Sequence, residues 1–465
     1  MKSVALHNLG CKVNAYEIEV MQQNLTENGY KIVPFAPGAD IYIINTCTVT
    51  NIADRKSRQM LHKAKKMNQD AIVVATGCYV QTDEKNVELD PCIDLAVGNN
   101  KKRDIVSIIE EYLKERDKTL HHTTILDIAH TEEYEEMTLH QTAEHTRAYI
   151  KIQDGCNQFC SYCIIPYARG RVRSRQAEDV LNEIRGLVAA GYREVVVTGI
   201  HLSSYGLDFI SKETNDYLKV NQDIRKEAYD REYLLNLLKE IQAIEGLERI
   251  RLGSLEPRII TEHFAQELSG LSKLCPHFHL SLQSGCNETL KRMNRHYTSE
   301  EFYEKVQILR DNFDHPAITT DIITGFPGET DEEFEQTRRF AEKTRFYEMH
   351  IFKYSRRKGT VADTLPGQLT EMQKAKRSNV LLDMEKQHSK EYRSQFIGRK
   401  VSVLLEEEKE INGGHYMVGH TPHYVLVACK AGKEFSNQIV EGMVKDFLAD
   451  EILVMSEEFV YPEEN

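Results

Sequence analysis

The chain has 465 residues, of which 41% are hydrophobic and 28% charged, a composition typical of a soluble globular protein with two to four domains. No stretch approaches the roughly 18 apolar residues of a membrane span, and no secretory signal is recognisable, so a cytoplasmic protein without a membrane partner is expected. The net charge of −13 argues against non-specific binding to nucleic acid but leaves specific binding open.

The first part of the chain, residues 1–115, alternates between short apolar runs and segments with helical spacing. Strands are expected at 2–9, 40–44 and 71–76, and helices at 14–28 and 53–67. This alternation predicts an open parallel α/β domain with helices on both faces of the sheet. Residues 116–141 carry charges, His and Thr without apolar periodicity, and we interpret them as a linker.

A cysteine follows each of the three expected strands, namely Cys11, Cys47 and Cys78. Ligands of open parallel sheets lie beyond the carboxyl ends of the strands, so the three thiols are predicted to converge on one site. Gly10 and Gly77 precede two of these cysteines and allow the tight backbone that such an approach requires. The alternative is that the cysteines are small residues buried separately at strand ends.

Residues 142–372 contain six strand-like segments, which alternate with helical ones. These segments are 148–153, 194–200, 249–253, 277–282, 318–324 and 347–352. Six βα repeats predict a partial barrel, in which chemistry belongs at the carboxyl ends of the strands. Residues 207–230 are polar and charged and are predicted to form a surface insertion.

A second group of three cysteines, Cys156, Cys160 and Cys163, follows the first of these strands. Three thiolates at C-x₃-C-x₂-C spacing can hold an iron–sulfur cluster and leave its fourth iron open. An open iron on a reducible cluster is what S-adenosylmethionine radical chemistry requires. A zinc site with a distant fourth ligand is the alternative. Ten cysteines without an export signal favour metal or redox use over disulfides.

Small and polar residues at the other strand ends are candidate cofactor contacts, because glycine admits a close backbone and Gln or Ser can form hydrogen bonds. They are Thr198, Gly199, His201, Ser281, Gln283 and Gly325, together with Arg356 in a later basic segment. No catalytic side chain is singled out. The other cysteines, Cys92, Cys275, Cys286 and Cys429, have no partner pattern and are interpreted as structural.

Three basic clusters interrupt the acidic chain and are either solvated faces or contacts to a polyanion. The first lies within 55–66, the second comprises Arg169, Arg171, Arg173 and Arg175, and the third spans 353–358. The four alternating arginines are the preferred candidates for phosphate contacts, because alternation on an extended segment places them on one side.

The last part, residues 373–465, begins with a helical segment that ends near residue 395. Beyond it, β-prone runs at 400–405, 424–428 and 451–455 predict a small β-barrel. Small barrels often bind nucleic acid, but the acidic composition of this one also suits a plain packing module.

Nearly the whole chain resembles the methylthiotransferase family of radical S-adenosylmethionine enzymes. The resemblance rests on 9–14, 45–50 and 75–78 in the first part, and on 155–170, 282–285, 321–329 and 354–360 in the second. The end resembles a TRAM domain, a small barrel that holds RNA. Around Cys11 and Cys47 the sequence is similar to the branch that acts on N6-threonylcarbamoyladenosine in tRNA.

The resemblance implies two [4Fe-4S] clusters and S-adenosylmethionine. Cys156, Cys160 and Cys163 would hold the cluster that cleaves this cofactor, and Cys11, Cys47 and Cys78 an auxiliary cluster that delivers the methylthio group. The implied target is C2 of the adenine at position 37, in the anticodon stem-loop of tRNA. A reducing electron donor and a sulfur donor are implied as further partners. The alternatives are a ribosomal-protein aspartate as target, or a non-catalytic metal-holding protein that binds RNA.

Overall fold

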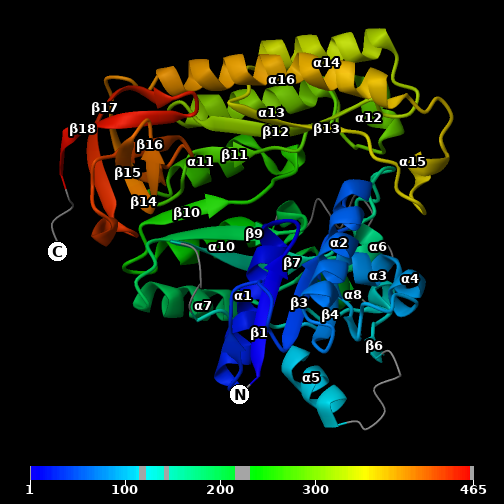
Figure 1. The fold of residues 1–465 in the computed structure, drawn as a ribbon. Helices are drawn as coiled ribbons and strands as arrows, with labels where there is room; N and C mark the ends of the chain where they lie inside the picture. Colours follow the sequence, from blue (N-terminus) through cyan, green and yellow to red (C-terminus); the bar gives the residue numbers. More distant parts are fainter. Residues whose placement is uncertain (1, 115–121, 141–145, 215–230, 461–465) are drawn as a thin grey trace.

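The computed structural model describes residues 2–114, 122–140, 146–214 and 231–460 (Figure 1). Among the helices of these ranges, none combines the length and the apolar composition that a membrane crossing requires.

The N-terminal part is one parallel sheet with the strand order β2-β1-β3-β4-β5-β6. Its strands are β1 (Ser3–Asn8), β2 (Lys31–Ile32), β3 (Ile41–Thr46), β4 (Ile72–Gly77), β5 (Leu95–Val97) and β6 (His122–Thr124). Every residue of β3 and β4 is buried, as expected for central strands covered on both faces. The helices are α1 (Lys12–Glu27), α2 (Asn51–Met67), α3 (Cys78–Thr82), α4 (Glu84–Glu88) and α5 (Ile105–Lys114). The predicted open parallel α/β fold is confirmed.

The interpretation of residues 116–141 as a linker is wrong for the part that the structure describes. Strand β6 pairs with β5 and extends the sheet, and a 3₁₀ turn, η1 (Ile128–His130), follows it. Met137 and Leu139 are fully buried, and the Tyr16 hydroxyl of α1 donates a hydrogen bond to the Met137 carbonyl. The segment packs because its few apolar residues enter the shared core, although they show no periodicity.

The central part is a partial barrel of parallel strands, which confirms the expected architecture. Its six strands are β7 (Arg147–Asp154), β9 (Glu194–Gly199), β10 (Arg249–Leu252), β11 (His277–His279), β12 (Ala317–Thr324) and β13 (Glu348–Lys353). Parallel bridges, Ile250 to Leu274 and Leu255 to Leu280, connect the sheet that contains β10 to the sheet that contains β11. The short β8 (Arg173–Ser174) pairs antiparallel with β7 at the edge.

Helices cover the outside of this barrel (Figure 1). They are α7 (Ala177–Ala189), α8 (Leu207–Thr214), α10 (Tyr233–Gln242), α11 (Glu262–Ser269), α12 (Asn287–Arg292), α13 (Ser299–Asn312) and α14 (Asp331–Thr344), with 3₁₀ turns η2 (Leu202–Ser204) and η3 (Pro257–Ile259). The predicted surface insertion begins too early, because Leu207 and Ile210 of α8 are buried against Val172 and Tyr233. Residues 215–230 lie outside the described part of the chain.

The long helix α16 (Glu371–Ser394) crosses one side of the molecule from α15 (Val361–Thr364) to the terminal barrel (Figure 1). That barrel is closed in the order β14-β15-β16-β18-β17. Its elements are β14 (Lys400–Ile411), β15 (Gly414–His420), β16 (Leu426–Cys429), the 3₁₀ turn η4 (Lys433–Phe435), β17 (Ile439–Ala449) and β18 (Ile452–Val460). The predicted small barrel is thus present.

The terminal barrel docks where the strands of the central part begin. Arg249 Nη1 donates to the His420 carbonyl at 2.9 Å, and Arg251 Nη1 donates to the Pro422 carbonyl at 2.9 Å. Both arginines lie beside Glu194, the buried first residue of β9. The carboxyl ends of the same strands, where chemistry is expected, are therefore free for a site.

Candidate active site between two cysteine trios

Cys11, Cys47 and Cys78, which we call the auxiliary trio, stand at one edge of the N-terminal sheet. They follow β1, β3 and β4, which are neighbours in that sheet. A Cβ placed on Gly10, whose φ is 117°, would lie 3.3 Å from the Cys47 sulfur. Burial raises the pKa of Cys47 to about 12, and the nearby thiols of Cys78 and Cys11 contribute to the rise. The structure therefore brings together three thiols that are far apart in sequence.

Cys156, Cys160 and Cys163, the core trio, lie on the loop after β7. Burial is the main cause that raises the pKa of Cys163, and Cys160 and Cys156 add to it. Arg295 Nη1 donates to the Cys160 sulfur at 3.3 Å. Asn294 Nδ2 donates to the Phe159 carbonyl at 3.0 Å, so the segment after α12 holds this loop in place.

The chemistry of both trios fits an iron–sulfur cluster. Burial and neighbouring thiols raise the pKa of Cys47 and of Cys163 and so disfavour their ionised thiolate forms. A bound cation reverses this preference and stabilises the thiolate. Thiolate is also the soft ligand that iron–sulfur clusters select. Cys11 is exposed, and Cys160 and Cys163 are half-buried, so each trio is reachable from one side. Three sulfur ligands and an open side match a cluster with one iron free for a further ligand.

A cavity of about 240 Å³ lies between the N-terminal sheet and the barrel mouth. Val49 and Thr50, two and three residues after Cys47, line the cavity on one side. Cys163 and Tyr162 of the core loop line it on the other side. The remaining lining comes from barrel residues, among them Gln283, Asp321, Ile323, Phe352 and Tyr354. A molecule in this cavity would contact the core trio and the segment that carries Cys47.

The short helix α6 (Ile165–Arg169) begins two residues after Cys163. It packs against α3, the helix that begins with Cys78. Asn99 Nδ2 donates to the Ala168 carbonyl at 2.7 Å and lies 3.7 Å from the Cys78 sulfur. Helix α6 therefore connects the core loop to the segment that carries Cys78.

A buried charge network fixes the N-terminal sheet to the barrel at this place. Glu17 of α1 accepts from Arg169 Nη1 at 2.7 Å and from Lys151 Nζ at 2.9 Å, and it also pairs with Lys102. Burial alone would raise the pKa of Glu17, but Arg169, Lys102 and Lys151 outweigh it and hold that pKa well below its usual range. Breaking such a buried pair costs about 3–5 kcal/mol.

The prediction that the alternating arginines contact phosphate is wrong for three of the four. The side chains of Arg169, Arg173 and Arg175 are each 1% exposed. Arg175 pairs with Glu183 of α7, so these side chains form structural ion pairs inside the protein. Arg171 is half-buried with its guanidinium 4.5 Å from the Phe159 ring, and its role as a phosphate contact stays a prediction.

Among the expected cofactor contacts, Gln283 lines the cavity and has a left-handed backbone with φ of 71°. His201 lies beside the core trio loop, where its Nε2 is 3.3 Å from Gln158 Nε2. Thr198 and Gly199 are the last two residues of β9, three and two residues before this histidine. Gly199 approaches Gln153 so closely that a Cβ would lie 2.9 Å from Oε1.

The other three candidates have structural partners. The Ser281 carbonyl accepts from Arg295 Nη2 at 3.1 Å. A Cβ on Gly325 would lie 2.4 Å from Lys374 Cγ, so this glycine allows α16 to pack against the barrel. Arg356 is exposed and pairs with Asp363 at 2.9 Å. Sequence reasoning does not find Arg295 or Asn99, because each acts through a contact that no local spacing reveals.

Comparisons with known proteins agree with this geometry. Residues 150–341 match the model of the radical SAM superfamily, and residues 3–98 match a family described as uncharacterized protein family UPF0004. In solved structures, a radical S-adenosylmethionine methyltransferase, TsrM from Kitasatospora setae, shares the fold with a TM-score of 0.53 at 16% identity, over 76% of this chain and 73% of that one.

Curated relatives match over nearly their full length. The threonylcarbamoyladenosine tRNA methylthiotransferase MtaB of Bacillus subtilis is 39% identical over 95% of this chain and 93% of its own. The protein of the same name from Aquifex aeolicus is 37% identical over 89% and 95%. The tRNA-2-methylthio-N(6)-dimethylallyladenosine synthase of Desulfotalea psychrophila is 34% identical over 93% and 95%. The chain belongs to the tRNA methylthiotransferase family of radical S-adenosylmethionine proteins.

Proposed function

We propose that this protein adds a methylthio group to C2 of N6-threonylcarbamoyladenosine at position 37 of tRNA, next to the anticodon. The observation that carries the proposal is the cavity lined both by Cys163 and by the segment that follows Cys47. The choice of nucleoside is supported by the two relatives named for threonylcarbamoyladenosine, which are 39% and 37% identical to this chain.

Each trio of thiols has a separate role in this proposal. Cys156, Cys160 and Cys163 hold the [4Fe-4S] cluster that binds S-adenosylmethionine, and Cys11, Cys47 and Cys78 hold the auxiliary cluster. With these groups bound, the protein has a source of a carbon radical and a source of sulfur within one site. The C2–H bond of adenine is neither acidic nor open to nucleophiles, so acid–base catalysis by side chains would be too weak.

The protein's own residues then bind and orient the nucleoside and the cofactor, and they exclude water. Tyr162, Ile323 and Tyr354 give the cavity an apolar lining, which suits a flat base and keeps other hydrogen donors away. Gln283, four residues after β11, and Asp321, within β12, are polar residues that line the same space. We assign them to orienting the bound nucleoside or the cofactor.

The rim of the cavity carries exposed cations and apolar side chains that suit an RNA loop. Helix α2 contributes the exposed cations Arg55 and Lys56, and the segment after β13 contributes Lys353, Arg356 and Lys358. Helix α2 and the segment after β13 meet where the backbone N–H of Asn51 donates a hydrogen bond to Ser355 Oγ at 3.1 Å. Ile52 and Phe352, exposed to 55% and 47%, offer surfaces on which unstacked bases can pack. We propose this rim as the contact for the anticodon loop.

The division of the chain follows from these roles. We propose an auxiliary-cluster domain (1–115), a radical core (142–372), and a terminal part (373–465) whose barrel is a TRAM domain. Since this barrel docks at the starts of the core strands, its RNA contact would be to a part of the tRNA other than nucleotide 37. A cytoplasmic location, a reducing electron donor and a sulfur donor complete the proposal.

Two cysteine variants and a control test this assignment. Cys47→Ala and Cys163→Ala are each expected to lose about four iron atoms per chain. Cys47→Ala keeps reductive cleavage of S-adenosylmethionine but makes no methylthio nucleoside, whereas Cys163→Ala does neither. Cys92→Ser, outside both trios, keeps the iron and both reactions. Nucleosides of tRNA from a deletion strain carrying each variant are measured by mass spectrometry. Modification of dimethylallyladenosine or of a ribosomal-protein aspartate instead would overturn the substrate assignment.

A further inference from the structure

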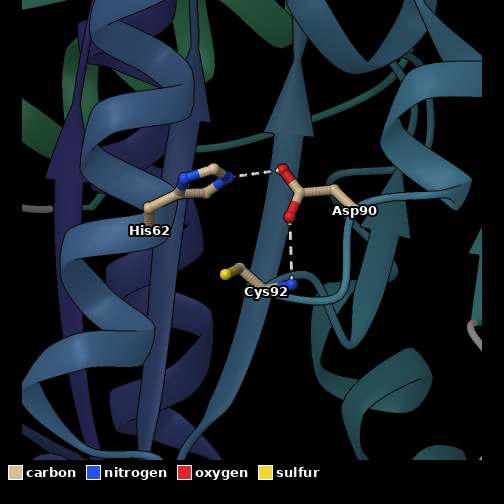
Figure 2. Close-up of side chains that lie close together, drawn as sticks. All are labelled: His62, Asp90 and Cys92. Carbon is tan, nitrogen blue, oxygen red and sulfur yellow. Dashed lines mark hydrogen bonds and ion pairs between the residues drawn. The ribbon is translucent and has the colours of Figure 1, made fainter.

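A third group of potential metal ligands lies on the N-terminal domain, outside both cysteine trios. It consists of His62 on α2, and Asp90 and Cys92 on the segment between α4 and β5 (Figure 2). The imidazole and the carboxylate face each other with the thiol beside them, and their ligand atoms all lie within 4.8 Å of one another. We propose that these three side chains bind a zinc ion.

The geometry around Asp90 prepares this site. One carboxylate oxygen of Asp90 lies 2.7 Å from His62 Nε2, and the other accepts the backbone N–H of Cys92 at 3.0 Å. The second bond fixes the turn that presents the thiol beside the carboxylate (Figure 2). The three ligands therefore come from two elements that are already held together without an ion.

The size of the group suits zinc. Zinc bonds of about 2.0–2.3 Å at tetrahedral angles separate the ligand atoms by roughly 3.4–3.8 Å. The distances between the ligand atoms of His62, Asp90 and Cys92 need to change by about 1 Å to bind zinc. The His62 side chain is 54% exposed and can move by this amount. Three protein ligands leave the fourth position to water.

The ligand types and charges favour zinc over harder cations. Magnesium and calcium prefer sites made of oxygen alone, whereas zinc accepts nitrogen, sulfur and oxygen together. A neutral imidazole, a carboxylate and a thiolate together balance the two positive charges of zinc. Lys65, the nearby cation, is held by Asp94 at 2.9 Å.

The site is distinct from the cluster sites and has a structural consequence. His62 lies roughly 18 Å along the helix from Thr50, which caps α2 and lines the cavity, at 1.5 Å per residue. A zinc ion here ties the middle of α2 to the segment that leads into β5. It thereby stiffens α2, whose first turn forms one side of the proposed RNA contact. This effect on RNA binding rests on the proposed function.

The test measures zinc in tag-free, iron-loaded protein after dialysis against a weak chelator. The wild type is expected to retain about one zinc ion per chain, and His62→Ala and Cys92→Ser to retain none, with iron content unchanged in all three. His130→Ala is the matched control, because His130 and Asp127 form a similar pair at 2.7 Å, also on the N-terminal part of the chain. X-ray absorption at the zinc edge is expected to show one sulfur and three nitrogen or oxygen ligands.

A second measurement separates binding from loss of structure. Zinc is expected to raise the melting temperature of the wild type and of His130→Ala, but not of His62→Ala or Cys92→Ser. Zinc retained equally by all variants, no zinc in the wild type, or a zinc environment with two or more sulfur ligands would each overturn the proposal. The last result would mean that zinc occupies a cluster site. Since iron content is followed in parallel, failure here is distinguishable from failure of the proposed function.

Discussion

The Arg357 guanidinium reaches from the segment after β13 into the N-terminal domain, where its Nη1 lies 2.6 Å from Asp54 Oδ2. The same group donates to Asn51 Oδ1 at 2.7 Å and to Thr48 Oγ1 at 2.6 Å. Thr48 is the residue after Cys47, so one side chain connects the barrel mouth to the auxiliary trio. The distance between the two trios therefore depends on this contact.

Replacing Arg357 with Ala is expected to uncouple the two halves of the reaction. The change removes the guanidinium that pairs with Asp54 and donates to Thr48, and it destabilises the protein by about 3 kcal/mol. We expect cleavage of S-adenosylmethionine to continue while methylthio transfer falls more steeply, because only the transfer requires both trios in register. The ratio of 5′-deoxyadenosine to methylthio nucleoside measures this. Arg185→Ala, at an exposed pair with Glu178 on α7, serves as the control and should change stability by no more than about 1 kcal/mol.

Removing exposed cations from the rim is expected to weaken tRNA binding. Lys56→Ala and Lys358→Ala should each lower affinity and reduce the slope of log affinity against log salt by about one. Lys239→Ala on α10, away from the cavity rim, should leave both quantities unchanged. Filter binding or fluorescence anisotropy over a series of salt concentrations provides the measurement. Equal effects of all three variants would mean that the rim is not the RNA contact.

Arg295 is expected to set the reduction potential of the cluster held by the core trio. It is half-buried, and its positive charge and hydrogen bond to the Cys160 sulfur stabilise added negative charge. Arg295→Met should therefore lower the potential and make the cluster harder to reduce. A redox titration followed by electron paramagnetic resonance would detect the change. Arg292→Met is a control of similar size that pairs with Glu333 instead of a cysteine, and an unchanged potential in both variants would contradict the assignment.

How far the sequence could predict the site differs between its parts. The strands that precede the cysteines are short apolar or alternating runs, and the rule that ligands gather at carboxyl ends places both trios correctly at strand ends. The prediction for the arginine run was wrong because its partners, Glu17, Asp154 and Glu183, lie on other elements, namely α1, β7 and α7. Alternation shows which side a residue is on, but not whether that side faces water or a buried carboxylate.

The terminal barrel shows the same limit for strands. β15 and β17 were not among the runs expected from the sequence. β15 contains Gly414, His415, Gly419 and His420, which are poor markers of a strand. β17 shows repeated register shifts against β18, which interrupt the alternation of apolar and polar residues. Closure of the barrel forms these strands in spite of their weak local preference.

Glu194 is expected to make stability depend on pH at the junction with the terminal barrel. Burial would raise its pKa, but Arg251, Arg147 and Arg249 outweigh this and lower it to about 2. A carboxyl whose folded pKa is depressed contributes stability above its unfolded pKa of about 4.3, and that contribution is lost as pH falls toward 2. Glu194→Gln should therefore cost about 3 kcal/mol at neutral pH and progressively less below pH of about 4. The measurement is urea unfolding of both chains at several pH values, made without clusters so that acid loss of iron does not affect the result. The difference in free energy of unfolding between variant and wild type should shrink as the pH falls.

Phe352 is expected to hold the RNA through ring stacking at the cavity rim. Its side chain lines the cavity and is 47% exposed, an unusual position for phenylalanine unless a partner covers it. Stacking of one base on an aromatic ring is worth about 1–3 kcal/mol, so Phe352→Ala should weaken tRNA binding by roughly 5–150-fold. Phe352→Tyr keeps the ring and should retain affinity, and Val361→Ala, at an apolar residue exposed to 60%, controls for loss of surface area alone. Retained affinity in Phe352→Ala would move the RNA loop away from this rim, whereas a loss restored by tyrosine would place a base against the ring.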